Sequence, residues 1–284
     1  MLGNKKIVFI GAGSMSEAMI SGIVHSKKVP PKNITVTNRS NNHRLKELQK
    51  KYGITGVNRN NLDICNIDII VLAMKPKDAE TSLQSIFDSL KPNHLILSVL
   101  AGVSTTFIEK NAPFGQQVIR VMPNTSSMIG ESATAISSGN HTSAQNITIA
   151  QELLQSIGEV YVIPEEKMDF FTGIAGSGPA YFYYLMEHME KEAQKSGLNS
   201  QIIRQIIAQT IVGAAKMIQE DGTSPKILRE NVTSPNGTTA AGLEALKRNG
   251  GGKAIAEAIK HAAHRSKEIS LQLEESKIST GVIG

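Results

Sequence analysis

The chain has little cysteine, no tryptophan and few other aromatic residues. Cys65 is the single cysteine among 284 residues, which excludes an internal disulfide framework, argues against a cysteine-built zinc site and suits a reducing compartment. The seven histidines do not cluster in the sequence either. We therefore expect no metal site and no disulfide.

Long hydrophobic runs are also missing. No apolar stretch approaches the roughly 20 residues of a membrane span, and the first one, IVFIGAG, runs directly into glycines. We expect a soluble, cytoplasmic protein without a membrane partner. With 40% hydrophobic residues, the chain has ample material for a packed core, as one large domain or as two of ordinary size.

The excess of charge of one sign is small. The sequence has 30 Lys and Arg against 25 Asp and Glu, which gives a formal net charge of +5. Because the basic residues are scattered and aromatic residues make up only 4%, we expect no nucleic-acid partner. A mild positive field suits anionic small ligands at least as well.

What is present begins with a nucleotide-binding pattern. Residues 6–13, KIVFIGAG, and the following SMSEAMISGIV predict a strand, a tight turn and a helix. Gly11 allows the turn, Gly13 lets a pyrophosphate approach the backbone, and the helix N-terminus offers free amides. Ser16 stands where a third glycine is usual, and it is small enough for close packing.

Strands and helices alternate through the rest of the first half. The segments HRLKELQKKY and SLQSIFDSL are typical of linking helices, and further strands are predicted at 33–40, 68–76, 94–102, 117–124 and 133–139. This alternation favours an α/β fold with a Rossmann-type, doubly wound and mostly parallel sheet. Such a sheet binds ligands at the carboxyl ends of its strands.

The end of the second strand bears on the choice of cofactor. NAD sites usually place an acid there to hold the ribose 2′-hydroxyl, whereas this chain has Asn38, Arg39 and Ser40. Arg39 and the Ser40 hydroxyl suit a 2′-phosphate. We therefore favour NADPH as cofactor, with NADH possible and a solvated turn as the plain alternative.

Three later strand ends carry residues suited to the same ligand. Lys75 and Pro76 end one apolar run, and Lys75 is expected over the crevice for the nicotinamide ribose or the diphosphate. Ala101 and Gly102 offer a small-residue floor for a nicotinamide. The segment MPNT at 122–125 adds an amide and a hydroxyl at this edge of the sheet.

The second half has helical periodicity from residue 164 onward. We therefore predict a Rossmann domain at 1–163 and an all-helical substrate-binding and dimerisation domain at 164–284. The stretch SQIIRQIIAQTIVGAAKMIQE at 200–220 is apolar on almost every face and needs burial on more than one side. A homodimer or larger homo-oligomer would provide that burial, and a well-buried monomer core is the alternative.

Two polar or glycine-rich segments interrupt these helices. GIAGSGPAYFYY at 173–184 opens a long helix with glycines that allow close approach of another backbone or a ligand. NVTSPNGTTAAG at 231–242 combines hydroxyl side chains with an Asn-Gly turn at a helix entrance. By itself this second segment suits either an ordinary cap and loop or an anchor for a ligand.

Six segments together resemble the pyrroline-5-carboxylate reductase family over nearly the whole chain. They are, in order, GAGSMSEAM, MKP, RVMPNT, AGSGPAYFYYLMEHMEKEAQKSGL, LRENVTSPNGTTAAGLEAL and HAAHRSKE. AGSGPAY and TSPNGTT are the most specific of them. The resemblance implies NAD(P)H-dependent reduction of 1-pyrroline-5-carboxylate to L-proline, the last step of proline synthesis, by a Rossmann domain and a dimerising helical domain.

The resemblance also implies roles for individual residues. In the substrate site, the amides of Gly237, Thr238 and Thr239 would hold the carboxylate, and the Thr239 hydroxyl would lie near the ring nitrogen as the catalytic group. Glu165 would approach the substrate, although the adjacent Glu166 leaves that register open. The implied cofactor residues are Gly11, Ala12, Gly13, Ser14, Met15, Asn38, Arg39, Ser40, Asn60, Met74, Lys75, Pro76, Ala101 and Asn231.

The chemistry of this substrate agrees with the lack of an obvious acid–base pair. A protonated cyclic imine is already a good hydride acceptor, so the enzyme needs alignment and charge complementarity rather than a strong acid, a nucleophile or a metal. A helix N-terminus is a natural anchor for the carboxylate. His188, His261 and His264 are expected on helix surfaces, outside the chemistry.

Two positions depart from the family pattern. Asn236 occupies a position usually held by glycine, and Ala175 one usually held by serine. Asn tolerates a left-handed backbone better than most residues, so the loop can still form. Ala175 removes a hydroxyl near the site. Neither change removes a group that the chemistry requires, but both bear on turnover and substrate fit.

Two alternatives stay open at this point. A catalytically weak paralogue could bind NADP and have a regulatory or interaction role, but the complete TSPNGTT loop argues against it. A reductase of the β-hydroxyacid dehydrogenase type would share the two-domain plan and place a lysine acid in the helical domain. Here Glu187, His188 and Glu190 precede Lys191, with no lysine near the start of that helix.

Overall fold

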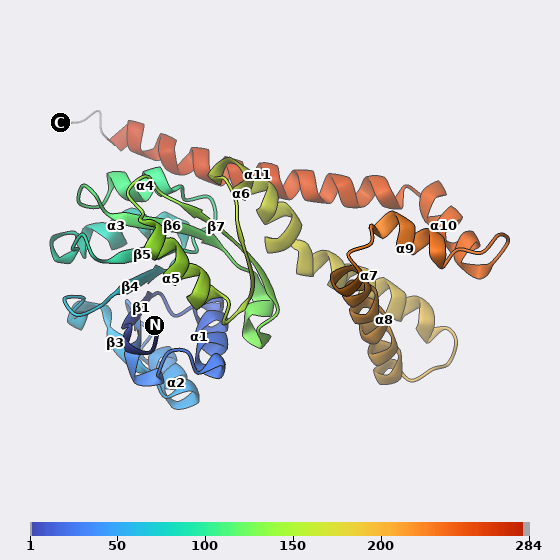
Figure 1. Cartoon of the computed structure of the whole chain (residues 1–284), viewed down its shortest axis with the longest axis horizontal. Coiled ribbons are helices and arrows are strands. Elements are labelled where there is room, and N and C mark those ends of the chain that lie inside the picture. Colours follow the sequence, from blue (N-terminus) through green and yellow to red (C-terminus); the bar gives the residue numbers. More distant parts are fainter. Residues whose placement is uncertain (1, 281–284) are drawn as a thin grey trace. The chain divides into compact units, whose positions relative to one another are not determined.

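The computed structural model describes residues 2–280, and its first part is an α/β unit built on a single twisted sheet (Figure 1). The 8-stranded sheet has the order β3-β2-β1-β4-β5-β6-β7-β8. Its strands are β1 (Ile7–Ile10), β2 (Ile34–Asn38), β3 (Thr55–Asn58), β4 (Ile69–Leu72), β5 (Leu95–Ser98), β6 (Gln117–Met122), β7 (Ser132–Ser138) and β8 (Gly158–Val162).

The pairing confirms the predicted doubly wound, mostly parallel sheet. All neighbouring strands are parallel except β6 and β7, which are antiparallel. All six predicted strands are present. Strands β3 and β8 were not predicted from the sequence, and they are the two edge strands, with side chains that are only partly buried or exposed.

Helices cover both faces of the sheet because successive strand side chains point to opposite sides. Ile7 and Phe9 of β1 belong to one buried cluster, together with side chains of α1 (Ser14–Ser26), α2 (Asn42–Tyr52) and α5 (Ala144–Leu154). Val8 and Ile10 belong to a second cluster, with α3 (Ala79–Gln84) and α4 (Thr105–Lys110). These two layers fix the strand ends at which the site is built.

The predicted linking helix SLQSIFDSL is wrong in its extent. The α-helix α3 ends at Gln84, and only a short 3₁₀ turn, η5 (Phe87–Ser89), follows. Two residues lie between them, and the second, Ile86, has φ −119°, which is outside the range of an α-helix and interrupts the hydrogen-bond ladder.

A second compact unit, Gly178–Ile259, consists of helices. Its helices are α7 (Gly178–Gln194), α8 (Ser200–Asp221), α9 (Pro225–Asn231) and α10 (Thr238–Arg248), and it includes the start of α11 (Gly251–Thr280). Side-chain caps fix two of the starts, since Asn199 accepts from the Gln201 amide and Ser224 from the Ile227 amide. None of the described helices has the length and hydrophobicity needed to cross a lipid bilayer.

The compact units divide the chain differently from the predicted domains 1–163 and 164–284. The first unit continues to Ser177 and takes up the chain again from Lys260. One reason is that Met168, in α6 (Met168–Phe171), is buried against the α/β unit. Another is that the Ser266 hydroxyl of α11 donates to the Asp169 carboxylate at 2.8 Å.

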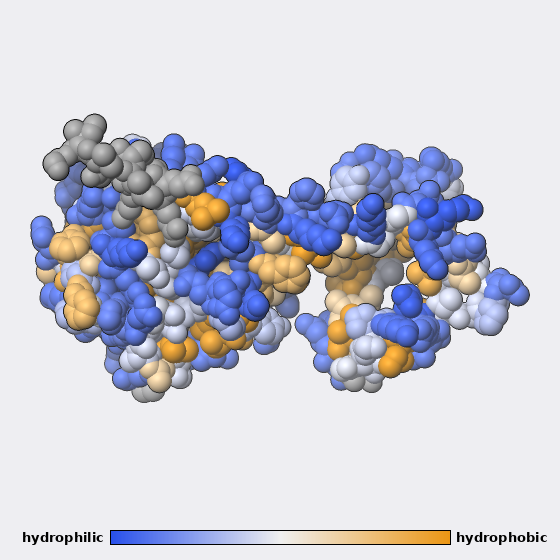
Figure 2. Space-filling model, turned by 90° about the horizontal axis from the view of Figure 1, so that it is seen from above, coloured by the Kyte–Doolittle hydropathy of each residue, from blue (hydrophilic) through white to orange (hydrophobic). Residues whose placement is uncertain are grey.

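The helical unit leaves most of its large apolar side chains at the surface. Among its described residues, the buried large apolar side chains are Ile203 and Ile207 of α8, while Ile206 on the same helix is 54% exposed. Hydrophobic residues accordingly reach the surface over these helices (Figure 2). The exposed set includes Phe182, Tyr183, Tyr184, Leu185, Met189, Ile202, Val212, Met217, Ile218, Ile227 and Leu246.

Candidate active site

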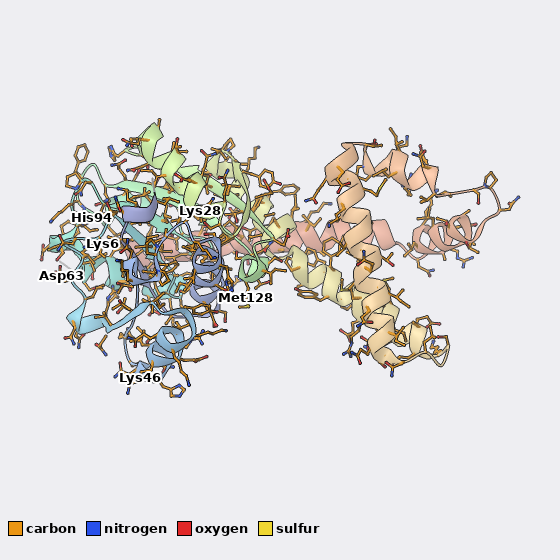
Figure 3. The ribbon with its side chains drawn as sticks, turned by 60° about the horizontal axis from the view of Figure 1, so that its bottom comes forward. Lys6, Lys28, Lys46, Asp63, His94 and Met128 are labelled. Carbon is orange, nitrogen blue, oxygen red and sulfur yellow. The ribbon has the colours of Figure 1, made fainter. Side chains whose placement is uncertain are left out.

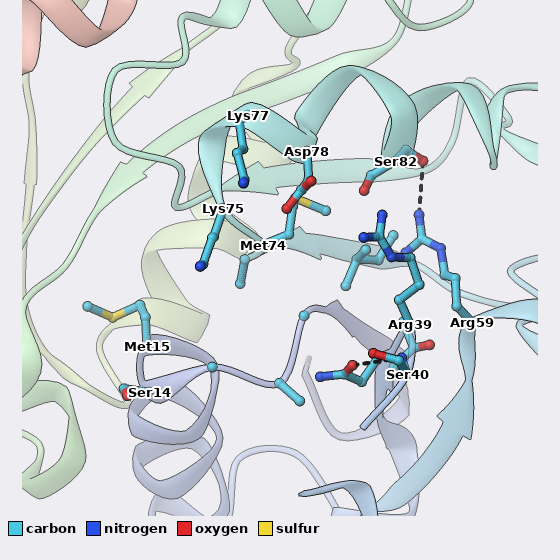
Figure 4. Close-up of a pocket in the computed structure, with 17 residues that line it drawn as sticks. Ser14, Met15, Arg39, Ser40, Arg59, Met74, Lys75, Lys77, Asp78 and Ser82 are labelled. Carbon is cyan, nitrogen blue, oxygen red and sulfur yellow. Dashed lines mark hydrogen bonds between the residues drawn. The ribbon is translucent and has the colours of Figure 1, made fainter. Parts of the chain in front are cut away.

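A cleft of about 630 Å³ opens at the carboxyl ends of β1, β2 and β4 (Figure 4). Strands β1 and β4 flank the point at which the strand order reverses, which is where doubly wound sheets bind their ligands. Ten predicted cofactor residues line this cleft: Gly11, Ala12, Gly13, Ser14, Met15, Asn38, Arg39, Ser40, Met74 and Lys75.

The glycine turn after β1 has the geometry that its sequence predicts. Gly11 has φ +122°, and a Cβ there would lie 2.4 Å from the Ala73 carbonyl oxygen, so no other residue fits. Ser16 is buried and donates its hydroxyl to the Gly11 carbonyl at 2.8 Å, which accounts for serine at the third glycine position. A Cβ on Gly13 would meet nothing within 4 Å, so this side of the turn is open.

The first turn of α1 offers unpaired backbone amides to the cleft. Gly13 caps the helix without a side-chain hydrogen bond, and the first helical bond runs from the Glu17 amide to the Gly13 carbonyl at 3.0 Å. The amides of Ser14, Met15 and Ser16 therefore have no acceptor within the helix. Together with the positive end of the helix dipole, they suit a diphosphate.

A cluster of ionic side chains holds this turn from its other side. Arg44 of α2 donates Nε to the Ala12 carbonyl at 3.1 Å and forms an ion pair with Glu17. Lys51 and Tyr52 donate to the same carboxylate at 2.8 and 3.0 Å. The hydrogen bond from Lys51, with those from Arg44 and Tyr52, outweighs the effect of burial and lowers the pKa of Glu17 to about 2.

The turn after β2 carries no carboxylate. The Asn38 side chain accepts hydrogen bonds from the Ser40 and Asn41 amides at 3.2 and 3.1 Å, so it shapes the turn. Among the described residues, Arg39 makes no ion pair. A cation and a hydroxyl at this position fit a phosphate ester on an adenosine ribose better than a free 2′-hydroxyl.

Cations dominate the lining of the cleft. Four of them, Arg39, Arg59, Lys75 and Lys77, share the cleft with one carboxylate, that of Asp78. Lys75 and Lys77 both extend into it (Figure 4). This donor set, with the amides of α1, fits a polyanionic dinucleotide.

Some lining residues were missed in the sequence. Lys77 and Asp78 lie within three residues of Lys75, which was predicted, so their nearness to Lys75 in the sequence could have identified them. Arg59 and Ser82 lie across the cleft from the glycine turn, and Arg59 follows β3, a strand that was not predicted.

Four of the predicted cofactor residues do not line this cleft. Asn60 lies on the turn after β3, where its amide donates to the Asn58 side chain at 3.1 Å. Pro76 begins the short turn after Lys75, and Ala101 packs against the buried cluster around Met168. Asn231 ends α9 in the helical unit. Their cofactor roles remain predictions.

The Glu165 carboxylate already has partners within the α/β unit. It accepts from the Thr105 amide at 2.8 Å and from the Thr105 hydroxyl at 2.5 Å, at the start of α4. The buried Arg120 of β6 lies 3.5 Å from Glu165 and 3.2 Å from Asp169. This network holds the Glu165 carboxylate in place, and its substrate contact remains a prediction.

The glycine-rich segment before α7 forms a π-helical turn, η8 (Thr172–Gly176). Such turns are rare and frequently occur at functional sites. The Asn124 side chain donates to the Ala175 carbonyl at 3.1 Å, which ties this turn to the end of β6. Because the bond uses the backbone of Ala175, the serine hydroxyl that the family pattern would place there is not needed for it.

The TSPNGTT loop ends at a helix N-terminus that no side chain caps. Asn236 has φ +60°, the left-handed conformation that glycine would adopt without cost. The Gly237 amide, which was predicted to bind the substrate, donates instead to the Ser234 carbonyl at 3.1 Å. Gly237 caps α10 without a side-chain hydrogen bond, so the amides of Thr238 and Thr239 are left without an acceptor in the helix.

The described histidines do not gather around a site. His188 lies on α7 with Nδ1 2.9 Å from the Tyr184 carbonyl, and His264 pairs with Glu268 at 3.2 Å on α11. Among the side chains described in residues 2–220 and 222–272, no group of three His, Cys, Asp or Glu is arranged to hold a metal ion.

The sheet topology and the cationic cleft at its strand ends place the chain among Rossmann-type dinucleotide-binding proteins, here with an additional helical unit. Residues 6–102 match the family model for coenzyme F420-dependent NADP oxidoreductases, and residues 165–269 match the model for pyrroline-5-carboxylate reductase dimerisation.

Known relatives narrow this class. Pyrroline-5-carboxylate reductase 1 of Bacillus subtilis is 60% identical over 272 residues, which cover 96% of this chain and 92% of the relative. Reductase 2 of the same organism is 46% identical and covers 94% and 96%. The chain therefore belongs to the pyrroline-5-carboxylate reductase family.

Solved structures agree with this assignment. The crystal structure of Plasmodium falciparum pyrroline carboxylate reductase with NADP bound is 27% identical, with a TM-score of 0.86 over 95% of this chain and 100% of that one. The reductase of Coxiella burnetii is 30% identical, with a TM-score of 0.85 over 94% and 99%.

Proposed function

We propose that this protein reduces 1-pyrroline-5-carboxylate to L-proline and uses NADPH in preference to NADH. The observation that carries the proposal is the 60% identity to a pyrroline-5-carboxylate reductase over 96% of the chain. The cationic cleft at the strand ends supports it independently. Nothing in the structure or in the comparisons favours a catalytically weak binding paralogue.

The α/β unit would hold the cofactor. The amides at the start of α1 and the open side of Gly13 suit the diphosphate. Arg39 and Ser40 suit a 2′-phosphate. Lys75 extends into the cleft closer to Ser14 and Met15 than Arg39 does. Asn60, Pro76, Ala101 and Asn231 complete the proposed cofactor contacts by resemblance only.

The helical unit would supply the anchor for the substrate. We assign the substrate carboxylate to the free amides of Thr238 and Thr239 at the start of α10, because a helix N-terminus favours an anion. The Thr239 hydroxyl would lie near the ring nitrogen. Gly237 would act as the cap that forms the turn, since its own amide is already bonded to Ser234.

The reaction needs little acid–base chemistry from the chain. A bound nicotinamide cofactor supplies the hydride, which adds to the imine carbon, and the electron pair of the C=N bond passes to the ring nitrogen, which keeps its proton. The residues of the chain align the ring and neutralise the carboxylate. The Thr239 hydroxyl can orient the protonated nitrogen by accepting a hydrogen bond from it.

The helical unit also supports a homodimer or a larger homo-oligomer. Its exposed apolar side chains on α7 and α8 are too numerous for a free surface, and each gains about 1.5–3 kcal/mol from full burial. A second copy of the chain is the partner that the dimerisation family model indicates. A cytoplasmic location is part of the same proposal.

An assay of the purified protein tests the activity. With NADPH and racemic 1-pyrroline-5-carboxylate, we expect NADPH oxidation and stoichiometric L-proline. No oxidation at millimolar imine would overturn the proposal. The same assay with NADH measures the cofactor preference, and we expect a lower kcat/KM with NADH.

A pair of variants at one position tests the substrate anchor. Thr239→Ala should lower kcat/KM about 10- to 100-fold, since one hydrogen bond to a charged group contributes about 1.5–3 kcal/mol. Thr239→Ser keeps the hydroxyl and should recover most of the activity. Thr148→Ala removes an exposed hydroxyl on α5 and serves as the control. If Thr239→Ala kept the wild-type kcat/KM, the assignment of the hydroxyl would be wrong.

A further inference from the structure

The edge strand β3 ends in the same way as its neighbour β2. The two strands are parallel, and their register pairs Asn38 directly with Asn58. Each of these asparagines is followed by an arginine, Arg39 after β2 and Arg59 after β3. Because the carboxyl ends of paired parallel strands lie side by side, the two arginines leave the sheet at adjacent positions of the same edge.

Both side chains reach the cleft already described. Arg39 and Arg59 line it, and both extend toward its interior from the second and third strand ends (Figure 4). This part of the cleft lies beyond the glycine turn, on the side where a doubly wound sheet binds the adenosine ribose. The diphosphate has separate donors at the start of α1, so it does not account for these two cations.

Arg59 is held in place before any ligand binds. Its Nη2 donates to the Ser82 carbonyl at 2.9 Å and to the Ser85 hydroxyl at 2.8 Å. Both hydrogen bonds use one nitrogen of the fork, which leaves Nε and Nη1 for another acceptor. Burial lowers the pKa of Arg59, although an arginine stays charged.

Neither arginine has an acidic partner among the described residues. Among the side chains that the structure describes, those of residues 2–220 and 222–272, no ion pair includes Arg39 or Arg59, although a partly buried cation is normally neutralised. Two guanidinium groups that share a cleft repel each other until an anion with more than one negative charge lies between them. A phosphate monoester has that charge and the oxygen geometry that arginine forks bind.

We propose that Arg59 forms, with Arg39, a two-arginine clamp for the 2′-phosphate of NADPH and so determines cofactor specificity. This inference rests on the proposed function for the identity of the cofactor, and it adds a residue from β3 to the selection of NADPH over NADH. The fixed Nη2 orients the guanidinium, and the opposite edge binds the phosphate oxygens.

Direct binding of two cofactor fragments tests the clamp without any turnover. Adenosine 2′,5′-bisphosphate carries the 2′-phosphate and adenosine 5′-monophosphate lacks it. By titration calorimetry, Arg59→Gln should bind the bisphosphate about 10- to 100-fold more weakly than the wild type, as expected for one charge-assisted contact. Its affinity for the monophosphate should change less than threefold.

Enzyme kinetics give the matching readout. Arg59→Gln should raise the KM for NADPH about tenfold or more and leave kcat and the KM for NADH near their wild-type values. Lys46→Gln is the control, because Lys46 points outward from α2 and does not line the cleft (Figure 3). It removes the same charge from the same unit and should change neither KM.

Three outcomes would overturn the clamp. If Arg59→Gln lost the same affinity for both fragments, Arg59 would only support the segment of Ser82 and Ser85 or stack on the base. If it lost no affinity for either, Arg59 would not contact the phosphate. The third concerns Arg59→Lys, which keeps the charge without the fork. This variant should lower the affinity for the bisphosphate less than Arg59→Gln does. An Arg59→Lys protein that binds the bisphosphate as tightly as the wild type would contradict the clamp even if Arg59→Gln failed to fold, because a contact made by the arginine fork must weaken without it.

The two levels of inference fail in different ways. If the enzyme proposal is wrong, neither cofactor supports imine reduction. Arg59→Gln still binds the bisphosphate more weakly than the wild type does and binds the monophosphate almost unchanged. If the clamp is wrong, NADPH supports turnover normally in the wild type, and Arg59→Gln shows no loss of affinity that is selective for the bisphosphate.

Discussion

The two compact units of the chain differ in how they bury their apolar residues. In the α/β unit, all four residues of each of the strands β1, β4 and β5 are buried, and helices pack on both faces of the sheet. In the helical unit, the described large apolar side chains that are buried are Ile203 and Ile207, while Leu246 is 61% exposed.

This difference separates two ways of building a site. The proposed cofactor cleft is formed by strand ends whose positions are fixed by a core within the same chain. The proposed substrate anchor, at the start of α10, belongs to a unit whose apolar surface needs a second copy for burial. A self-sufficient cofactor unit and a pairing-dependent substrate unit should therefore respond differently to mutation.

The largest effect should come from breaking the pairing of the helical unit. Ile206→Asp places a charge on an apolar face of α8 that is exposed in the single chain. Association of two copies would bury this carboxylate without a partner, which costs several kcal/mol. We expect sedimentation equilibrium to give monomers, with activity reduced by at least tenfold. Gln201→Asp adds the same charge at an exposed polar position of α8 and should stay oligomeric. An Ile206→Asp protein of wild-type mass would contradict the comparison.

The second effect separates fold from binding within the α/β unit. A Cβ at position 11 would lie 2.4 Å from the Ala73 carbonyl oxygen, whereas one at position 13 would meet nothing within 4 Å. Gly11→Ala should lower the thermal unfolding temperature and abolish NADPH binding. Gly13→Ala should keep the wild-type unfolding temperature and still weaken NADPH binding, because its methyl group occupies the diphosphate position. Equal unfolding temperatures for the two variants would contradict this reading of the turn.

A smaller effect concerns acid stability of the α/β unit. The pKa of Glu17 is lowered from 4.5 to about 2, first by Lys51 and then by Arg44 and Tyr52. Its carboxylate therefore stabilises the fold above pH 4.5, and this contribution is lost as the pH falls from 4.5 toward 2. It amounts to at most about 3 kcal/mol.

Glu17→Gln measures this contribution. The variant should unfold at lower urea concentration than the wild type at pH 7, and the difference should shrink at pH 3. Glu131→Gln changes an exposed loop carboxylate and should follow the wild type at both pH values. A difference between Glu17→Gln and the wild type that stayed constant with pH would exclude the ionic role of Glu17.

The smallest effect concerns the loop before α10. Asn236 has φ +60°, a conformation that costs Asn little and a β-branched residue about 1–2 kcal/mol. Asn236→Gly should change kcat/KM less than twofold, and Asn236→Val should lower it severalfold by displacing the Thr238 and Thr239 amides. A large gain for Asn236→Gly would mean that the natural asparagine strains the loop.

The central strands of the fold were predictable because they are continuous apolar runs, which parallel sheets require. The edge strands were not, since TGVN and GEVYV are short, only partly apolar and exposed on one side. The residues at which each compact unit begins and ends could not be predicted from the hydrophobic pattern of the sequence either. They depend on contacts far apart in the sequence, such as that of Ser266 with Asp169.

The residues of the candidate site also divide into those that local sequence determines and those that depend on distant contacts. The glycine turn and the end of β2 were predictable because local motifs determine them. Arg59 was missed because its strand was missed. The partners of the Glu165 carboxylate, Thr105 and Arg120, are distant from it in the sequence and could not be predicted, while its substrate contact stays a prediction.

The mass of the active species tests most directly the claim that the substrate unit depends on pairing. Sedimentation equilibrium and NADPH-dependent imine reduction should be measured together over a dilution series. We predict that turnover persists only where the protein has an even multiple of the 30.6 kDa chain mass, and that specific activity falls as monomers form. A 30.6 kDa species that reduces the imine at the full rate would contradict the account.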